Sequence, residues 1–201
     1  VIKEIVKRNL DDKGITREII EDVVFGCANQ AGEDNRNVGR MSVLLAGLPV
    51  TVGGVTVNRL CGSGMQAVID ASRAIMTGEG DIMIAGGTES MTRAPFVMPK
   101  ATEAFTRTNA VYDTTIGWRF TNPKLAKMYY PYSMGETAEN VAKRYNIARE
   151  RQDEFAMHSQ QKAKEAILGG KFRNEITAVE IISKKETIVF DVDEFPRLDT
   201  T

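Results

Sequence analysis

The junction between an extended run and a helix, at residues 55–77, constrains the fold more than any other stretch. Val55–Leu60 has a strand-like pattern, and residues 63–77 keep an apolar helical period that stops before Gly78. Residues 23–28 and 81–87 are further buried-strand patterns, and residues 38–45 form a second helical one. Because strands and helices alternate, the sequence predicts an α/β layered fold, with a parallel or mixed sheet whose strands are central and buried on both faces.

Cys61 occupies this junction, in the stretch Cys61-Gly62-Ser63-Gly64. A thiol beside a helix N-terminus experiences partial positive charge and unpaired N–H groups, which favour the nucleophilic thiolate. The two glycines allow a sharp turn and leave room for a substrate. We therefore interpret Cys61 as a nucleophile. The alternative is a small buried core residue, since free cysteines are among the most buried residue types.

The second half of the chain changes character after residue 90. Residues 91–132 lose periodicity and contain four prolines, which predicts a loop-rich insertion that covers a ligand or contacts a subunit. Helical patterns follow at residues 134–145 and 149–168, and strand-like runs at 176–182 and 187–190 suggest a hairpin. The last residues, from Asp191, are acidic and extended.

Composition and charge narrow the function class. The sequence is 42% hydrophobic and 26% charged with a net charge of −1, as in a soluble globular protein. Residues 91–130 hold six Lys/Arg against two Asp/Glu, a net +4 that suits an anionic small ligand better than nucleic acid. No apolar run is long enough to span a membrane and no signal peptide is recognisable, so we expect a cytoplasmic protein without membrane or nucleic-acid partners. Two cysteines and one histidine predict neither a disulfide framework nor a metal cluster.

Three other residues are candidates for a site. His158 is the only histidine and the usual type of base for an acyl-transfer cysteine, but its pattern predicts an exposed or boundary helix position. Cys27 lies within an apolar strand, which indicates a packing residue. Trp118 is either a ligand-stacking residue or a buried anchor for its loop.

Four motifs together resemble the thiolases, the family of acetyl-CoA acetyltransferases and 3-ketoacyl-CoA thiolases. They are Gly26-Cys27-Ala28-Asn29-Gln30-Ala31-Gly32-Glu33, Asn58-Arg59-Leu60-Cys61-Gly62-Ser63-Gly64, Gly86-Gly87-Thr88-Glu89-Ser90-Met91 and Met134-Gly135-Glu136-Thr137-Ala138-Glu139-Asn140. Residues 113–120 resemble the β-ketoadipyl-CoA type of thiolase. The motifs occur in the family's order and span nearly the whole chain.

The resemblance implies that Cys61 accepts an acyl group from acyl-CoA and passes it to a second acyl-CoA, or reverses that reaction. It implies a partial N-terminal core at residues 1–90 and, at 91–201, a loop domain that covers coenzyme A. Met134 matches a residue that packs on the pantetheine, and Arg197 one at the nucleotide end of the coenzyme. Ser133 stands where short-chain members often have histidine. Coenzyme A thioesters are then the substrates and no cofactor is expected.

The resemblance also implies that part of the catalytic apparatus is missing. Thiolases take an Asn-Glu-Ala-Phe motif, a Gly-His-Pro motif and a second catalytic cysteine from a second half, and none of these occurs here. We therefore expect a fragment of the N-terminal half, without its first strand, that is inactive or nearly so by itself. Family members form dimers through the strand before the nucleophile, and dimers often form tetramers, so association through residues 55–60 is expected. Alternatives are a non-catalytic module for coenzyme A binding or subunit association, and a redox-responsive thiol at Cys61.

Overall fold

The computed structural model describes residues 1–200, which form two compact units that divide after Pro131. The first unit, Val1–Pro131, contains the parallel sheet and the insertion that follows it. The second unit starts at Tyr132. The functional boundary expected at residue 90 remains a prediction, since it concerns what covers coenzyme A.

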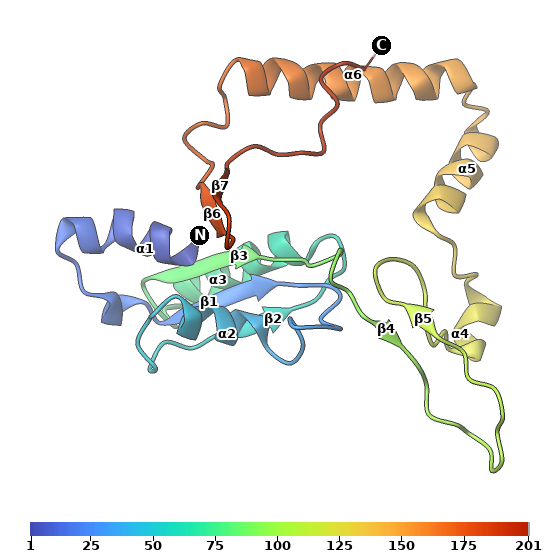
Figure 1. Ribbon diagram of the computed structural model, residues 1–201, viewed down its shortest axis with the longest axis horizontal. Helices are drawn as coiled ribbons and strands as arrows, with labels where there is room; N and C mark the ends of the chain where they lie inside the picture. The colour runs from blue at the N-terminus through green and yellow to red at the C-terminus, as the bar shows by residue number, and fades with distance from the viewer. Residues whose placement is uncertain (201) are drawn as a thin grey trace. The chain divides into compact units, whose positions relative to one another are not determined.

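A three-stranded parallel sheet is the centre of the first unit (Figure 1). Its order is β2 (Val55–Val57), β1 (Asp22–Gly26) and β3 (Met83–Gly87). The central strand β1 is buried on both faces, as its uninterrupted apolar run predicts. The same prediction is wrong for β2 and β3, which lie at the edges of the described sheet and keep partly exposed residues.

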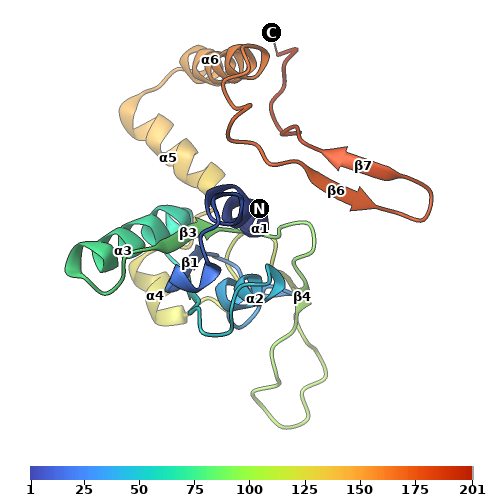
Figure 2. The same ribbon diagram turned by 90° about the vertical axis from the view of Figure 1, so that its left-hand side faces the viewer.

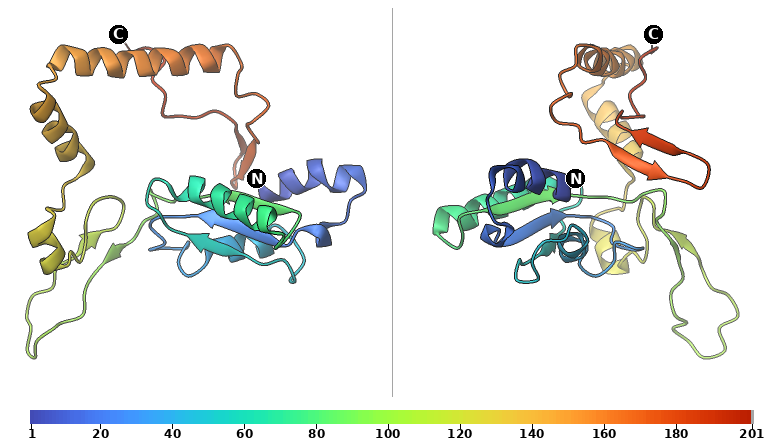
Figure 3. Two further views of the ribbon diagram at one scale, coloured as in Figure 1. Left: turned by 180° about the vertical axis from the view of Figure 1, so that it is seen from behind. Right: turned by 60° about the vertical axis from the view of Figure 1, so that its left-hand side comes forward.

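Helices cover both faces of this sheet, so that the first unit is an α/β/α sandwich (Figures 2 and 3). On one face, α1 (Ile2–Asn9) and α2 (Val38–Leu45) pack on alternate residues of β1. On the other face, α3 (Ser63–Thr77) packs its small residues closely against the sheet. The first layer contains Ile2, Val6, Val23, Phe25 and Val43, and the second contains Val24, Ala67 and Ala71.

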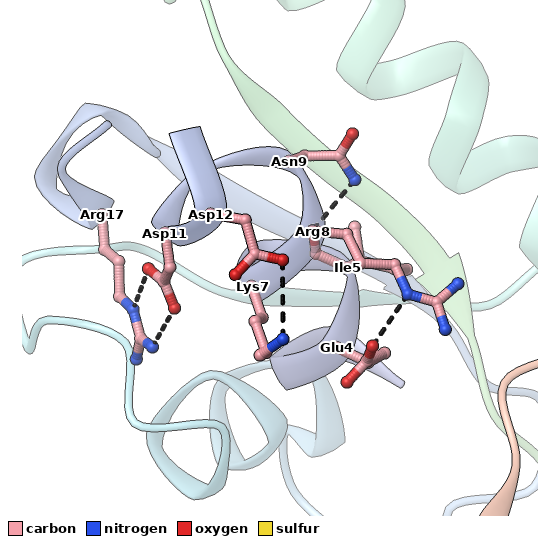
Figure 4. Close-up of polar contacts among 8 residues, drawn as sticks. All are labelled: Glu4, Ile5, Lys7, Arg8, Asn9, Asp11, Asp12 and Arg17. Carbon is pink, nitrogen blue, oxygen red and sulfur yellow. Dashed lines mark hydrogen bonds and ion pairs between the residues drawn. The ribbon is translucent and has the colours of Figure 1, made fainter. Parts of the chain in front are cut away.

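Arg17 joins the turn after α1 to the residues that follow α2. Figure 4 shows its pair with Asp11. Two short 3-10 helices, Asp11–Lys13 and Arg17–Ile19, form this connection. The Arg17 guanidinium donates two hydrogen bonds to the Asp11 carboxylate, at 2.9 and 2.5 Å, and a third to the carbonyl of Gly47 at 3.2 Å. The hydrogen bond from Arg17 lowers the pKa of Asp11, because it stabilises the charged carboxylate.

The insertion contains more regular structure than its sequence predicts. Strands β4 (Phe96–Val97) and β5 (Tyr112–Asp113) pair antiparallel, and α4 spans Pro123–Met128. The loop-rich insertion expected at residues 91–132 includes one helix that the sequence did not predict, α4, where Asn122 caps the helix through its side-chain oxygen, 2.9 Å from the Lys124 nitrogen. Proline at the first helical position has the required φ and lacks an N–H that would go unpaired.

The second unit consists of two helices and a hairpin. They are α5 (Met134–Tyr145), α6 (Arg149–Leu168), and the antiparallel strands β6 (Val179–Ile182) and β7 (Thr187–Phe190), in agreement with the helical and hairpin patterns. None of residues 132–200 is buried. Across residues 1–200, no helix is both long and apolar enough to cross a membrane.

Candidate active site

The nucleophile turn, which we define as residues 58–62, connects the end of β2 to the start of α3. The predicted strand over 55–60 is too long, because β2 ends at Val57 and the chain then turns. Leu60 has φ +49°, in the left-handed region that non-glycine residues seldom adopt. Cys61 is exposed, which contradicts the alternative of a buried core cysteine.

Ser63 and Asn58 hold this turn in its unusual conformation. The Ser63 hydroxyl accepts a hydrogen bond from the Arg59 N–H at 2.8 Å and donates one to the Leu60 carbonyl at 2.6 Å. Ser63 is buried, so these bonds are shielded from water. The Asn58 carboxamide oxygen accepts the Leu60 N–H at 2.9 Å. The presentation of Cys61 therefore depends on side chains on both sides of it.

The sheet register brings two further segments to this turn. Gly26, at the end of β1, pairs with Val57 on one side and with Gly87 on the other, so residues after all three strands meet at one edge. Gly26 also abuts the start of α3, since a Cβ there would overlap the Ser63 carbonyl carbon. This edge is where parallel α/β sheets commonly place ligands.

Glu89, just after β3, binds the loop that follows β1. Its carboxylate accepts the Ala28 N–H at 2.8 Å and the Asn29 N–H at 3.1 Å. The carbonyl of Ala28 in turn accepts a hydrogen bond from the Asn58 side-chain nitrogen at 2.9 Å. We call the Ala28–Asn29 pair the corner. It lies between Glu89 and the nucleophile turn and touches both.

Cys27 lies beside this corner and is only 1% exposed, as its apolar surroundings in the sequence indicate. Burial raises the pKa of its thiol to about 11, and the negative charges of Glu89 and Asp34 act in the same direction. Its sulfur lies 3.6 Å from Asp34 Oδ2 and 3.8 Å from Glu89 Oε1. Among residues 1–200, Cys27, Asp34 and Glu89 are the one cluster whose possible ligand atoms lie close enough together for a metal ion. Both carboxylate oxygens of Glu89, however, already accept hydrogen bonds from the backbone N–H groups of Ala28 and Asn29. We assign the cluster no metal.

The corner also contacts the insertion. The Asn29 side-chain nitrogen donates to the Thr114 carbonyl at 2.7 Å, and its oxygen accepts from the Arg119 guanidinium at 2.5 Å. Thr114 is 1% exposed and donates its hydroxyl to the Pro95 carbonyl at 2.6 Å. Residues beyond β3 are thereby attached to the same edge as Cys61.

Comparison with known proteins agrees with this geometry. The family described as "Thiolase, N-terminal domain" matches residues 1–201. The chain belongs to the thiolase family. A β-ketoadipyl-CoA thiolase of Acinetobacter baylyi is 58% identical over 183 residues, which are 90% of this chain and 46% of that protein. A β-ketoadipyl-CoA thiolase of Escherichia coli is 53% identical over 202 residues, covering 100% of this chain and 49% of that protein.

A solved thiolase structure confirms the fold class. The crystal structure of the Bacillus anthracis acetyl-CoA acetyltransferase superposes with a TM-score of 0.83 at 33% identity, covering 100% of this chain and 48% of that one. The predicted α/β thiolase fold is therefore confirmed. This thiolase chain spans about half the length of the curated relatives it matches.

Three site residues expected from the thiolase resemblance lie in the second unit. Ser133 caps α5, where its hydroxyl accepts the Glu136 N–H at 3.2 Å and its own N–H donates to the Glu136 carboxylate at 2.8 Å. Met134, the first residue of α5, is 69% exposed. The Arg197 N–H donates to the Gln160 side-chain oxygen at 2.8 Å, and Arg197 is exposed. Their contacts with coenzyme A remain predictions.

Two other candidates are exposed. His158 lies on the surface of α6, as its helix neighbours predict. Trp118 is 57% exposed, so within the described residues it is not a buried anchor. Sequence reasoning placed Asn58 and Glu89 inside thiolase motifs without giving either a role. The partner of Asn58 lies 30 residues away in the sequence, and those of Glu89 lie about 60 residues away. A pattern of neighbouring residues cannot indicate contacts over such separations.

Proposed function

We propose that this chain carries the acyl-accepting part of an acyl-CoA C-acyltransferase of the thiolase type. The observation that carries the proposal is the exposed Cys61 just before the N-terminus of α3, in a chain that belongs to the thiolases. The partial positive charge of a helix N-terminus stabilises negative charge that develops beside it.

In this reaction the Cys61 thiolate attacks the carbonyl carbon of an acyl-CoA thioester. A bond forms between that carbon and the Cys61 sulfur, the bond to the coenzyme sulfur breaks, and coenzyme A leaves as a thiolate that then takes a proton. One thioester replaces another, so the step has little free-energy change. A second acyl-CoA then takes the acyl group, or free coenzyme A takes it in the reverse direction. Coenzyme A thioesters are substrates in this scheme, which requires no other cofactor.

The substrate class rests on charge and on likeness to relatives. Residues 91–130 carry a net +4, from six Lys/Arg against two Asp/Glu, which suits the phosphates of coenzyme A. We assign Met134, Ser133 and Arg197 to the coenzyme as well, from their motif positions. Relatives of 58% and 53% identity are named β-ketoadipyl-CoA thiolases, which supports a 3-ketoacyl-CoA with a short dicarboxylic chain.

A complete catalytic cycle needs a base near Cys61, which the first unit does not supply as a histidine. The only histidine, His158, is an exposed residue of the second unit, so Val1–Pro131 contains no imidazole base. The two relatives extend over about twice the length matched here. We therefore propose acyl acceptance by the chain alone, and turnover only by a complete thiolase. A cytoplasmic location and a homodimer or homotetramer formed through β2 belong to the same proposal.

Acyl transfer to Cys61 tests the proposal directly. The chain is incubated with acetyl-CoA, and intact mass followed by peptide mapping locates any acetyl group. We expect one acetyl group on Cys61, and none in Cys61→Ser. Cys27→Ser is the matched control and should acetylate like the unaltered chain. Failure of Cys61 to acetylate in folded protein would refute the proposal.

The second candidate function is a non-catalytic module that binds coenzyme A, which the basic insertion favours. Calorimetry with coenzyme A distinguishes the two. Binding by both the unaltered chain and Cys61→Ser, without acetylation of either, supports the module. Acetylation of Cys61 supports the transferase.

A further inference from the structure

We propose that Asn58 is a positioning residue for the nucleophile Cys61. Glu89 in turn fixes the position of Asn58, through the Ala28–Asn29 corner. This inference rests on the proposed function, because it assumes that Cys61 is the acyl acceptor. It concerns how the first unit holds Cys61 in place, and every contact involved lies within residues 26–119.

The first step is the strain in the nucleophile turn. A left-handed conformation at a residue such as Leu60 is strained and persists only where its surroundings impose it. The hydrogen bond from the Leu60 N–H to the Asn58 carboxamide oxygen, at 2.9 Å, opposes relaxation of this conformation. Cys61 is the next residue, so a change in the dihedral angles of Leu60 would move its sulfur.

The second step is that Asn58 is itself anchored. Its side-chain nitrogen donates to the Ala28 carbonyl, at 2.9 Å and 30 residues away. One carboxamide therefore joins the turn to the loop after β1. Aspartate in its place keeps an acceptor for the Leu60 N–H but loses the donor to Ala28, so the two functions of Asn58 can be separated by substitution.

The third step is that Glu89 fixes the loop on which Asn58 relies. Its two carboxylate oxygens accept the N–H groups of Ala28 and Asn29, at 2.8 and 3.1 Å. Hydrogen bonds to an ionised group are stronger than those between neutral groups. The Ala28 peptide group is thus held by Glu89 on its N–H side and by Asn58 on its carbonyl side.

The Ala28–Asn29 corner also forms hydrogen bonds with the insertion, through the Asn29 side chain. Asn29 bridges the carbonyl of the buried Thr114 and the guanidinium of Arg119. The insertion that we propose to cover coenzyme A and the turn that presents Cys61 therefore share one anchor. Disturbing Glu89 should alter the placement of the nucleophile against the thioester more than the binding of the coenzyme.

Acylation kinetics of the intact chain test this inference. Initial rates of Cys61 acetylation are measured against acetyl-CoA concentration for Asn58→Ala, Asn58→Asp, Glu89→Ala and the double variant Asn58→Ala/Glu89→Ala. Asn9→Ala is the matched control, since Asn9 also donates to a backbone carbonyl, that of Ile5 at 2.9 Å on α1. Rates are expressed per folded molecule, from the fluorescence of Trp118.

We expect the maximal rate to fall about 10- to 100-fold in each single variant, since a misplacement of about 1 Å has effects of this size. The acetyl-CoA concentration at half-maximal rate should stay unchanged. Partial unfolding would also lower the total maximal rate, but it would leave the rate per folded molecule unchanged, so a fall in the rate per folded molecule indicates misplacement of Cys61. The double variant should be no slower than the slower single variant, because both residues act through one connection. Asn9→Ala should behave like the unaltered chain.

Hydrogen exchange of the Leu60 amide separates this inference from the proposed function. We expect faster exchange in Asn58→Asp and Glu89→Ala and unchanged exchange in Asn9→Ala. If the unaltered chain is not acetylated, the proposed function fails, while Leu60 exchange still decides whether Glu89 holds the turn. Unaltered Leu60 exchange in both Asn58→Asp and Glu89→Ala overturns the inference. If Asn58→Ala does not fold, those two variants carry the test.

Discussion

Replacing Gly26 by alanine should destabilise the first unit severely. A Cβ at this position would overlap the carbonyl carbon of Ser63, and would lie 2.5 Å from the nitrogen of Gly64 and 2.6 Å from the Ser63 carbonyl oxygen. All three atoms belong to the backbone at the start of α3, so no side chain can rotate away. The helix or the end of β1 would have to shift. Val24 of β1 and the buried Ala67 and Ala71 of α3 would then lose contacts with one another.

The cost follows from that geometry. Overpacking in a core costs about 1 to 3 kcal/mol, and we expect the upper end, about 3 kcal/mol, because the contacts are with backbone. For a denaturant dependence of about 2 kcal/mol per M of urea, the unfolding midpoint should fall by about 1.5 M. Urea unfolding is followed by the fluorescence of Trp118, the only tryptophan, which lies in the first unit.

Gly64→Ala is the matched control for Gly26→Ala. Gly64 lies in α3, where a Cβ added to it would meet no atom within 4 Å, and alanine is the better helix former by up to about 1 kcal/mol. Its midpoint should stay the same or rise. An unfolding midpoint of Gly26→Ala within experimental error of the unaltered chain would refute the close packing of β1 on α3.

Three further predictions concern Cys27, Cys61 and Ser133. The pKa of Cys27 is raised from 9.0 to about 11 in the folded chain, so its contribution to the free energy of unfolding is complete below pH 9 and is lost by about pH 11. The free energy of unfolding, measured from urea midpoints, should therefore fall by about 2 to 3 kcal/mol over this range. Cys27→Ala should show a smaller fall. At pH 8, iodoacetamide should alkylate the exposed Cys61 and leave the buried Cys27 unmodified, which peptide mapping checks; equal labelling of both would contradict the structure. Ser133→Ala should destabilise α5 by about 1 kcal/mol and Ser133→Thr by much less, measured by hydrogen exchange in the first turn of the helix.

The capping box of α5 also predicts a dependence on acidity. Hydrogen bonds from Ser133 lower the pKa of Glu136 from its ordinary 4.5, so the carboxylate stabilises the helix above that pH. This contribution is lost as the pH falls below 4.5 through the lowered pKa of the folded state. The protection of the first-turn amides of α5, measured against their intrinsic exchange rate at each pH, should therefore fall in this range, and Glu136→Gln should remove most of the change.

Local features of the sequence were enough to determine the longer helices and the candidate nucleophile. The predicted ranges of α3, α5 and α6 are those of the structure, because helical periodicity and the residues that end each helix, Gly78, Asn146 and Gly169, act within a few residues. The strand-to-helix junction likewise located Cys61. The α4 helix was missed because its signal is a single capping pair, Asn122 and Pro123, within an otherwise irregular stretch.

Tertiary structure alone decided what surrounds Cys61. Since β1 lies between β2 and β3, the residues after Gly26, Val57 and Gly87 meet at one edge, although they are far apart in the sequence. Hydrogen bonds among Ala28, Asn58 and Glu89 exist only because of that strand order. The sequence by itself determined the nucleophile and its helix, through interactions between near neighbours. Asn58 and Ser63 hold the turn through contacts with near neighbours. Only the packing of the sheet brought the distant groups of Ala28 and Glu89 to it, since hydrogen bonds reach about 3 Å and require the strands to be assembled first.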